Sequence, residues 1–509
     1  MNSHAWRGNY RGYIMTIRSL YQREKVNYRG VDYEIDSLDN SVNINGRKYK
    51  VIKNKVDVKK ITDLEEREQK YYFFDIDISI SDFFVTSKDI KAPIQEQEDL
   101  SFVCSIFNRN VSLGDRVIDS KLIHKLSFGK SDFAQELLFN FSNKEISGTH
   151  TKLEFIECNF GKKLKVRNYE TIIPNYYEDD VQPLPEKSRY PYHQQNKAQL
   201  KELKITDCTA DEGAYLRIGF LDIGKFELSN LRLPQNAELN IGDCHFQYFK
   251  LTNFRNMGKF KLYKINVLPK EYDKREGYNP RFQIDNTSIG GADFQSINLV
   301  SFARVIMFDN IFTELDYTNM QWEHEIKVGQ FGKANPPKVW NDSNLAKFLF
   351  DSYEFNRVEI AKKRDTHRTL KKVMIRNHDQ QEALVFYQKE MENHWQITEW
   401  KKDFGNKITL AFNKYTNEFG LNWWKPLCLL FGVSLLFYFL LLCNLDIPIL
   451  ELEHWRSYFE FLNPTHKTRF IAKEYWDFWS YAIDFLFRLI EGLLIYQTIQ
   501  AFRKYSRKL

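Results

Sequence analysis

Apolar side chains recur at every fifth position over residues 284–322 of this 509-residue chain. A period of five fits neither an α-helix, which would spread these positions over all its faces, nor a flat strand, which would alternate them between two faces. A solenoid with square coils buries every fifth residue. The series starts at Ile284, shifts once by three residues and ends at Trp322. The predicted solenoid core within it consists of Ile289, Phe294, Leu299, Phe302, Met307, Phe312 and Tyr317.

A weaker hexamer pattern, with apolar residues at positions 1, 3 and 6, extends this prediction toward the N-terminus. The copies are LEFIEC at 153, LKITDC at 203, FELSNL at 226, LNIGDC at 239, FKLTNF at 249, FKLYKI at 260 and FQIDNT at 282. We expect a β-solenoid over 96–335, in which the proline-rich and charged stretch 174–200 is an inserted surface loop. An antiparallel β-sandwich remains the alternative, because its strands are also spaced by 8–12 residues.

The two ends of this β region have different patterns. Before it, alternating runs flank Asn45-Gly46, which predicts a hairpin within an N-terminal β-rich unit over 1–95. After it, apolar residues at helical spacing over 350–420 predict an α-helical hairpin that is interrupted at Asn377-His378-Asp379, then an amphipathic stalk helix that ends at Gly420. The expected fold is therefore mainly β, followed by helices.

The last part of the chain, 421–509, has the pattern of a transmembrane domain. Residues 427–443 contain no charge over 17 positions, which is about 26 Å of helix, so we expect a span over about 425–445. Trp423, Trp424 and Lys425 precede it as predicted headgroup anchors. A second apolar and aromatic run over 476–502, followed by the predicted anchors Arg503 and Lys504, predicts a second span.

Basic residues near the two spans predict their orientation. Seven flank the outer ends of the pair, against four in the connecting stretch, which favours both termini in the cytoplasm. The N-terminal residues also lack the continuous apolar run of a secretory signal. The seven are Lys407, Lys414, Lys425, Arg503, Lys504, Arg507 and Lys508, and the four are Arg456, Lys467, Arg469 and Lys473. We expect the aromatic segment between the spans to form an interfacial helix.

Three charged residues interrupt the second predicted span. Asp484, Arg488 and Glu491 are spaced i, i+4 and i+7 and therefore line one face of a helix, with Thr498 further along. A lone charge at mid-bilayer costs about 2.5–3.5 kcal/mol on insertion scales, so these groups need partners. The first span offers no basic residue, which favours pairing between identical helices in a homo-oligomer. Such a stripe either lines a pore or closes a bundle.

The five-residue series resembles the pentapeptide-repeat family, most clearly at Ala292-Asp293-Phe294. This resemblance implies a right-handed quadrilateral β-helix. From about 200 to 509, the order of repeats, helical pair, NEFGLNWWKPL at 417–427 and two spans resembles a group of bacterial pentapeptide-repeat membrane proteins. That resemblance implies an inner-membrane location but no particular activity. Family members that imitate DNA are strongly acidic, whereas this chain carries a formal charge of +6, so their function is not implied.

Composition and motifs narrow the function classes further. A net charge of +6 on 73 basic and 67 acidic groups is too small to indicate nucleic-acid binding. The six cysteines have neither disulfide-framework nor zinc-finger spacing, so we expect reduced thiols. We find no phosphate-binding loop, dinucleotide fingerprint, zinc-protease or hydrolase motif, and the one tight acid/His cluster, Glu323-His324-Glu325, is expected to be a solvated cap. The sequence predicts no enzyme, cofactor or metal site.

These features predict an inner-membrane protein with a large cytosolic binding platform. The expected partners are the lipid bilayer, further copies of the chain, and a cytosolic protein or small-molecule ligand. A partner-gated pore or membrane-disrupting effector is the first functional hypothesis, by analogy with bacterial stress and antiphage effectors. A scaffold that tethers a soluble partner to the membrane is the alternative.

Overall fold

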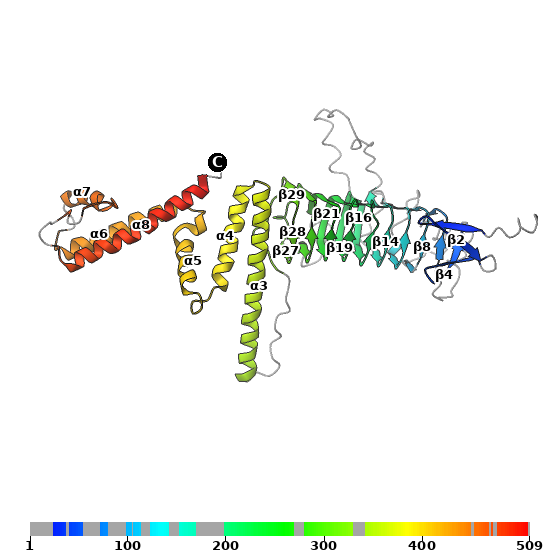
Figure 1. The fold of residues 1–509 in the computed structure, drawn as a ribbon, viewed down its shortest axis with the longest axis horizontal. Helices are drawn as coiled ribbons and strands as arrows, with labels where there is room; N and C mark the ends of the chain where they lie inside the picture. Colours follow the sequence, from blue (N-terminus) through cyan, green and yellow to red (C-terminus); the bar gives the residue numbers. More distant parts are fainter. Residues whose placement is uncertain are drawn as a thin grey trace, which may run out of the picture. The chain divides into compact units, whose positions relative to one another are not determined.

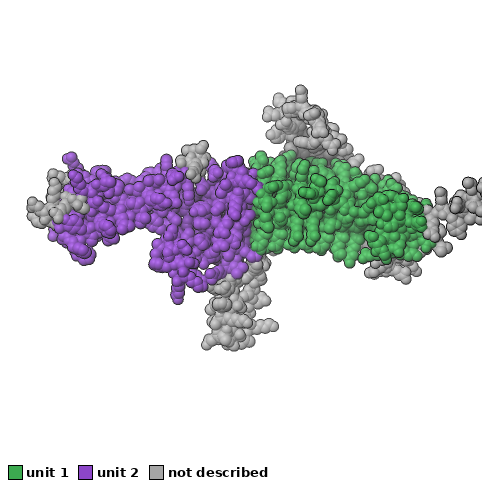
Figure 2. All heavy atoms as spheres, viewed as in Figure 1, with its two compact units in different colours: residues 1–323 green, residues 324–509 purple. Residues whose placement is uncertain are grey.

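The computed structural model describes residues 24–36, 40–53, 72–79, 98–103, 105–112, 123–141, 152–168, 198–268, 279–328, 342–448, 452–467, 470–471 and 476–506. Figures 1 and 2 show the chain as two compact units, Met1–Glu323 and His324–Leu509, which we treat separately. Residues 174–197 of the predicted inserted loop lie outside the described residues, as do Arg469, Lys473, Arg507 and Lys508 of the charge count.

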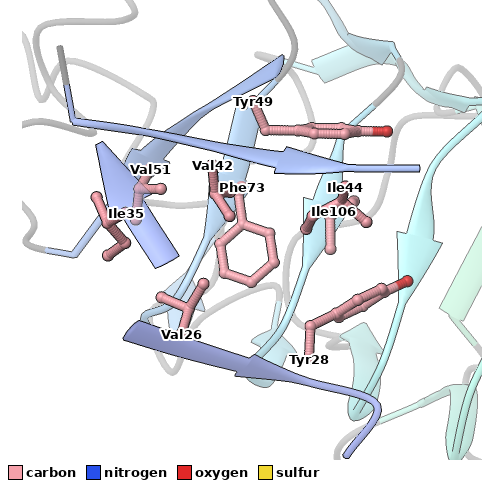
Figure 3. Close-up of a cluster of buried hydrophobic side chains, with 9 residues drawn as sticks. All are labelled: Val26, Tyr28, Ile35, Val42, Ile44, Tyr49, Val51, Phe73 and Ile106. Carbon is pink, nitrogen blue, oxygen red and sulfur yellow. The ribbon is translucent and has the colours of Figure 1, made fainter. Parts of the chain in front are cut away.

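The first unit begins with antiparallel strands. These are β1 (Lys25–Tyr28), β2 (Val31–Asp36), β3 (Ser41–Ile44) and β4 (Arg47–Ile52). The predicted hairpin joins β3 to β4, and both Asn45 and Gly46 have the positive φ that its two-residue turn requires. Side chains from these strands pack with Phe73 and Ile106 into one buried cluster, drawn in Figure 3.

From β4 onward, the pairing is parallel and forms three ladders. The first continues through β5 (Tyr72–Phe74), β8 (Ile106–Phe107), β11 (Asp132–Phe133), β14 (Asn159–Phe160), β17 (Thr209–Ala210), β20 (Arg232–Leu233), β22 (Arg255–Asn256), β25 (Ser288–Ile289) and β28 (Ile311–Phe312). The second contains β7 (Glu98–Val103), β10 (Ile123–Gly129), β13 (Lys152–Ile156), β16 (Ala198–Thr206), β19 (Leu221–Ser229), β21 (Glu238–Thr252), β24 (Arg281–Asp285) and β27 (Arg304–Phe308). The third contains β6 (Ile78–Ser79), β9 (Val111–Ser112), β12 (Glu136–Phe141), β15 (Lys163–Asn168), β18 (Tyr215–Gly219), the start of β21, β23 (Lys259–Val267), β26 (Ala292–Gln295) and β29 (Leu315–Thr318).

The hexamer pattern explains why the chain turns where it does. In all seven hexamers the fifth residue, which is polar, has a positive φ between 50° and 55°. Asn and Asp tolerate this conformation better than most residues, and they occupy five of the seven positions. The sixth residue then points inward and is buried in every copy. The fifth residues are Glu157, Asp207, Asn230, Asp243, Asn253, Lys264 and Asn286.

Six of the seven predicted core residues are buried, namely Ile289, Phe294, Leu299, Phe302, Met307 and Phe312. Tyr317 is only half-buried. It lies on β29, which pairs with β26 and with no other described strand, so this strand is the last of its ladder among the described residues. Its ring packs edge-on against Trp322 at 5.4 Å.

The second unit is helical. It contains α3 (Asp342–Arg376), α4 (Gln380–Ile397), α5 (Phe404–Asn417), the 3₁₀ turn η5 (Glu418–Gly420), α6 (Trp424–Asn444), α7 (Leu452–Phe461) and α8 (Phe478–Ser506). The predicted break at Asn377-His378-Asp379 separates α3 from α4, and the Asp379 carboxylate caps α4 by accepting from the Glu382 N–H at 3.1 Å. A helix, α7, is present where the sequence predicted one between the spans.

Candidate functional site in the α6 and α8 helix pair

Helices α6 and α8 pack against each other in antiparallel directions (Figure 1). At one end Trp423 packs edge-on against Phe502 with ring centroids 6.0 Å apart. At the other end the Asn444 side chain donates to the Asp477 carboxylate at 2.8 Å and to the Ser480 hydroxyl at 2.9 Å. Of the helices in the described ranges, α6 alone is both long and apolar enough to cross a membrane. Its 21 residues make about 31 Å of helix, close to the thickness of a bilayer core.

The two helices expose many apolar side chains, while their buried interior contains both apolar and polar residues. A helix pair in water would expose mostly polar side chains, so this surface suits a nonpolar environment. The exposed apolar residues are Leu429, Phe431, Leu435, Leu436, Phe439 and Leu440 on α6 and Phe485, Leu486, Leu489, Leu493, Tyr496, Ile499 and Phe502 on α8. The buried polar residues are Ser434, Ser480, Asp484, Glu491 and Gln497.

Asp484 is the centre of a buried ion-pair cluster. Its Oδ2 lies 3.0 Å from Arg488 Nε, one turn along α8, and its Oδ1 lies 2.7 Å from Nε2 of His466. Arg488 also donates from Nη2 to the His466 carbonyl oxygen at 2.9 Å. We call His466, Asp484, Arg488 and Glu491 the α8 cluster. The 463–466 turn and the helix therefore hold each other through both charge and backbone contacts.

Both ring nitrogens of His466 lie within hydrogen-bond distance of an oxygen atom. Its Nδ1 is 2.7 Å from the Asn463 carbonyl oxygen, which can only accept, and its Nε2 faces the Asp484 carboxylate. A neutral imidazole has one N–H, so it can donate to only one of these acceptors. His466 therefore lies between the Asn463 carbonyl oxygen and the Asp484 carboxylate and links the turn to α8.

Glu491 lies on the same face of α8, two turns beyond Asp484, and is fully buried. Neither of its carboxylate oxygens has a hydrogen-bond partner among the residues that the structure describes. An ionised carboxylate in this state is strongly disfavoured, so Glu491 needs a proton, a water molecule or a rearranged neighbour. It is the one member of the α8 cluster whose hydrogen bonding is incomplete.

Thr498 does not join this cluster. Its hydroxyl donates to the Leu494 carbonyl oxygen of its own helix at 2.8 Å. Its neighbour Gln497 instead makes a buried hydrogen bond with Asn417, which joins α8 to the end of α5. The spacing argument grouped Thr498 with the charges and passed over Gln497, because it considered only one helix face.

The predicted anchor residues gather at one end of the helix pair. Trp423 and Trp424 pack edge-on at 5.4 Å, and Trp424 is exposed. Lys425 Nζ lies 3.2 Å from a Glu418 carboxylate oxygen, and Lys504 Nζ donates to the Phe419 carbonyl oxygen at 3.3 Å. Arg503 is exposed next to Lys504 on α8. The antiparallel packing thus brings residues about 80 positions apart in sequence into one aromatic and basic belt, as a headgroup region requires.

The argument that these charges require a second copy of the chain is corrected by the structure. It assumed that α8 could find no partner within its own chain, but His466 from the connecting segment pairs with Asp484 and its backbone pairs with Arg488. His466 lies 18 residues before Asp484 in a stretch without helical periodicity, so spacing along α8 could not identify it. Self-association remains a prediction without this support.

Two residues of the Glu323-His324-Glu325 cluster, His324 and Glu325, have a structural role. His324 Nε2 lies 2.7 Å from a Glu382 carboxylate oxygen and Glu325 lies 2.5 Å from Lys389 Nζ, both on α4. In the described ranges, no group of three or more His, Cys, Asp or Glu side chains is arranged to hold a metal ion. These contacts hold His324 and Glu325, at the start of the second unit, against helix α4.

Comparison with known proteins gives no relative on which to base a function. No protein-family model matches the chain, and no curated protein or solved structure matches it either. The functional argument therefore rests on the geometry above.

Proposed function

We propose that this chain is a membrane-anchored binding protein whose helices α6 and α8 cross the bacterial inner membrane with both termini in the cytoplasm. The observation that carries the proposal is the apolar outer surface of the helix pair, whose interior includes the buried carboxyl groups of Asp484 and Glu491. Ionisable side chains in membrane helices lie in the interior and pair there, as the α8 cluster does. The aromatic and basic belt at Trp423 and Lys504 supports the same placement.

The proposed cytoplasmic platform is the strand-rich unit. We interpret its three parallel ladders as a right-handed β-solenoid related to the pentapeptide-repeat family, since equivalent residues recur along the ladders. Leu203, Phe226 and Phe249 face one another on successive strands, 23 residues apart. A spacing of 23 equals four pentapeptides and three further residues, which matches the three-residue shift in the sequence. Stacked coils of this kind present long, regular outer surfaces for binding.

Helix α5 supports a position at the membrane surface. Its side chains Phe404, Ile408 and Tyr415 share one exposed face, whereas Lys407 and Leu410 are buried against the helical unit. Figure 1 shows α5 running across the direction of α6 and α8, as a helix in the headgroup plane would run beside two spanning helices. We infer that this face rests on the cytoplasmic headgroups.

Extraction at alkaline pH tests the anchor. Full-length chain in membranes should stay in the pellet after carbonate treatment, whereas Leu436→Asp with Leu489→Asp should release or degrade most of it, because each Asp costs about 2.5–3.5 kcal/mol in the bilayer centre. The control replaces two exposed apolar residues of α3 by Asp, Val358 and Ile375, and should behave like the unmodified chain. Release of the unmodified chain by carbonate would refute the proposal.

A gated pore is the second candidate, and Glu491 is the observation that favours it. A buried carboxylate without a hydrogen-bond partner is a site where a rearranged, hydrated state would be more favourable. Planar-bilayer recordings decide between the two functions. A pore should conduct and lose its current when Asp484, Arg488 and Glu491 are all replaced by Leu, whereas a tether should be silent and still hold its ligand at the membrane.

A further inference from the structure

Like charges face each other on the outer surface of the strand-rich unit. Lys165 on β15 and Arg217 on β18 are register partners in the third ladder, and Lys163 and Arg167 lie on the same face of β15. Three other register pairs, Lys125 with Lys152, Arg232 with Arg255 and Arg281 with Arg304, are also like-charged, whereas other pairs in the ladders join opposite charges. Lys225 lies 2.7 Å from Glu202, and Glu227 lies 2.8 Å from Lys250. The Lys165 and Arg217 pair differs from the other like-charged pairs because two further basic residues, Lys163 and Arg167, lie on the same face of β15.

No carboxylate among the described residues pairs with Lys165 or Arg217. Partial burial, together with the neighbouring charges of Lys163, Arg167 and Arg217, lowers the pKa of Lys165 to about 8. Like charges opposite each other in a sheet are destabilising. An anion that binds between them would relieve this repulsion.

Two glycines, Gly219 and Gly242, lie close to Arg217 on neighbouring strands. Arg217 hydrogen-bonds Tyr263, whose ring lies over Gly242 so closely that a Cβ there would sit 2.1 Å from a ring carbon. On successive strands, Arg167 is the register partner of Gly219, Gly219 is the partner of Gly242, and Gly242 is the partner of Tyr263. Of the described side chains, none comes within 4 Å of the place where a Cβ of Gly219 would lie. Beside Arg217 the surface is therefore formed by backbone at Gly219 and by the Tyr263 ring at Gly242.

The positive area is short. Lys165 and Arg217 belong to a row of register partners across the third ladder. On β12 the partner of Lys165 is Leu138, and on β21 the partner of Arg217 is Asn240. Lys261 comes next and is paired with Glu238 at 3.7 Å, and Asp293 follows it. A nucleic-acid strand would need a basic stripe over many strands, which this row does not offer. Its length suits a single phosphate or diphosphate group.

We propose that Lys165 and Arg217, with Arg167 and Tyr263 beside them, bind the phosphate group of a small soluble ligand. Neighbouring strands are about 4.8 Å apart, so two cations at this distance can contact one dianion. The guanidinium group of Arg217 can bind two phosphate oxygens side by side, and Lys165 supplies a point charge. This inference rests on the proposed role of the strand-rich unit as a binding platform and names the chemistry of its ligand.

Equilibrium dialysis of the detergent-solubilised full chain against labelled inorganic pyrophosphate tests the site at constant ionic strength. Lys165→Met and Arg217→Met should each weaken binding by about tenfold, the effect of losing one charge-assisted contact. The matched control is Lys225→Met, which removes a lysine that has its own Glu202 and Glu227 partners, and should change affinity by less than about twofold.

Competition experiments distinguish a soluble phosphate ligand from the phosphate of a lipid headgroup. ATP should displace pyrophosphate, whereas vesicles of phosphatidylglycerol should not; displacement by the vesicles alone would overturn the proposal of a soluble ligand. Equal losses in Lys225→Met and Lys165→Met, or no binding at all, would also overturn it. Lys165→Met removes a repulsion, so its melting temperature should not fall, which excludes misfolding as the cause. Carbonate extraction of the same variants should be unchanged, so failure here is distinct from failure of the membrane anchor.

Discussion

Replacing Asp484 by Leu is expected to destabilise the helical unit by about 3–5 kcal/mol, the usual effect of removing one partner from a buried ion pair. The change leaves Arg488 and His466 close together without the carboxylate that both contact. Unfolding of the detergent-solubilised full chain in SDS mixtures, followed by tryptophan fluorescence, measures the loss. The effect should not depend on protein concentration, because the pairing lies within one chain.

The double variant Asp484→Leu with Arg488→Leu is the control for this prediction. It removes both charges, so it should be more stable than Asp484→Leu alone and recover a large part of the loss. A single variant as stable as the unmodified chain, or a double variant with the summed loss of both single changes, would contradict the ion-pair account. A loss that grows with dilution would instead place the partner on another copy.

Replacing Phe155 by Ala is expected to lower the free energy of unfolding of the strand-rich unit by about 3–5 kcal/mol, which includes the cost of the cavity. Phe155 is fully buried on β13. Its ring stacks on Phe128 at 5.4 Å and meets Phe139 and Phe160 edge-on at 5.9 and 5.6 Å. Urea unfolding of the full chain, followed by circular dichroism of the strand signal, measures the change.

A control for Phe155 is available on the same strand. Lys152 lies at the start of β13 with its side chain on the outer face, so Lys152→Ala should change stability by less than about 0.5 kcal/mol. Phe155→Leu should lose less than Phe155→Ala, because most of the volume is kept. Equal, small effects of Phe155→Ala and Lys152→Ala would show that the stacked rings are not the core of this unit.

The sequence could predict features that depend on local spacing. Apolar positions of the hexamers identified the buried side chains, and Asn45-Gly46 identified the hairpin, because strand alternation and turn chemistry act over a few residues. The polar fifth residue of each hexamer carried a further signal that was not used. Asn or Asp at 207, 230, 243, 253 and 286 marks five of these seven positions of positive φ. The half-buried Tyr317 shows that spacing alone cannot identify where a ladder ends.

The parts of the site that could not be predicted are contacts between distant segments. His466 reaches Asp484 from a turn without periodicity, and Asn417 reaches Gln497 across 80 residues. Spacing along one helix shows which residues share a face but not what packs on that face. Two of the three charged side chains of α8, Asp484 and Glu491, are buried, and the contact of Asp484 with His466 is one that spacing along a helix could not identify.

Lipid exposure of α6 and α8 tests the central claim most directly. Spin labels at Leu436→Cys and Leu489→Cys, in a chain whose native cysteines are replaced by Ser, should collide often with oxygen and rarely with a water-soluble nickel complex in phospholipid vesicles. A label at Lys402→Cys, an exposed position before α5, should show the reverse. This result would place the outward face of the helix pair in the acyl chains. Ready access of the nickel complex to both Leu436→Cys and Leu489→Cys would contradict the membrane anchor.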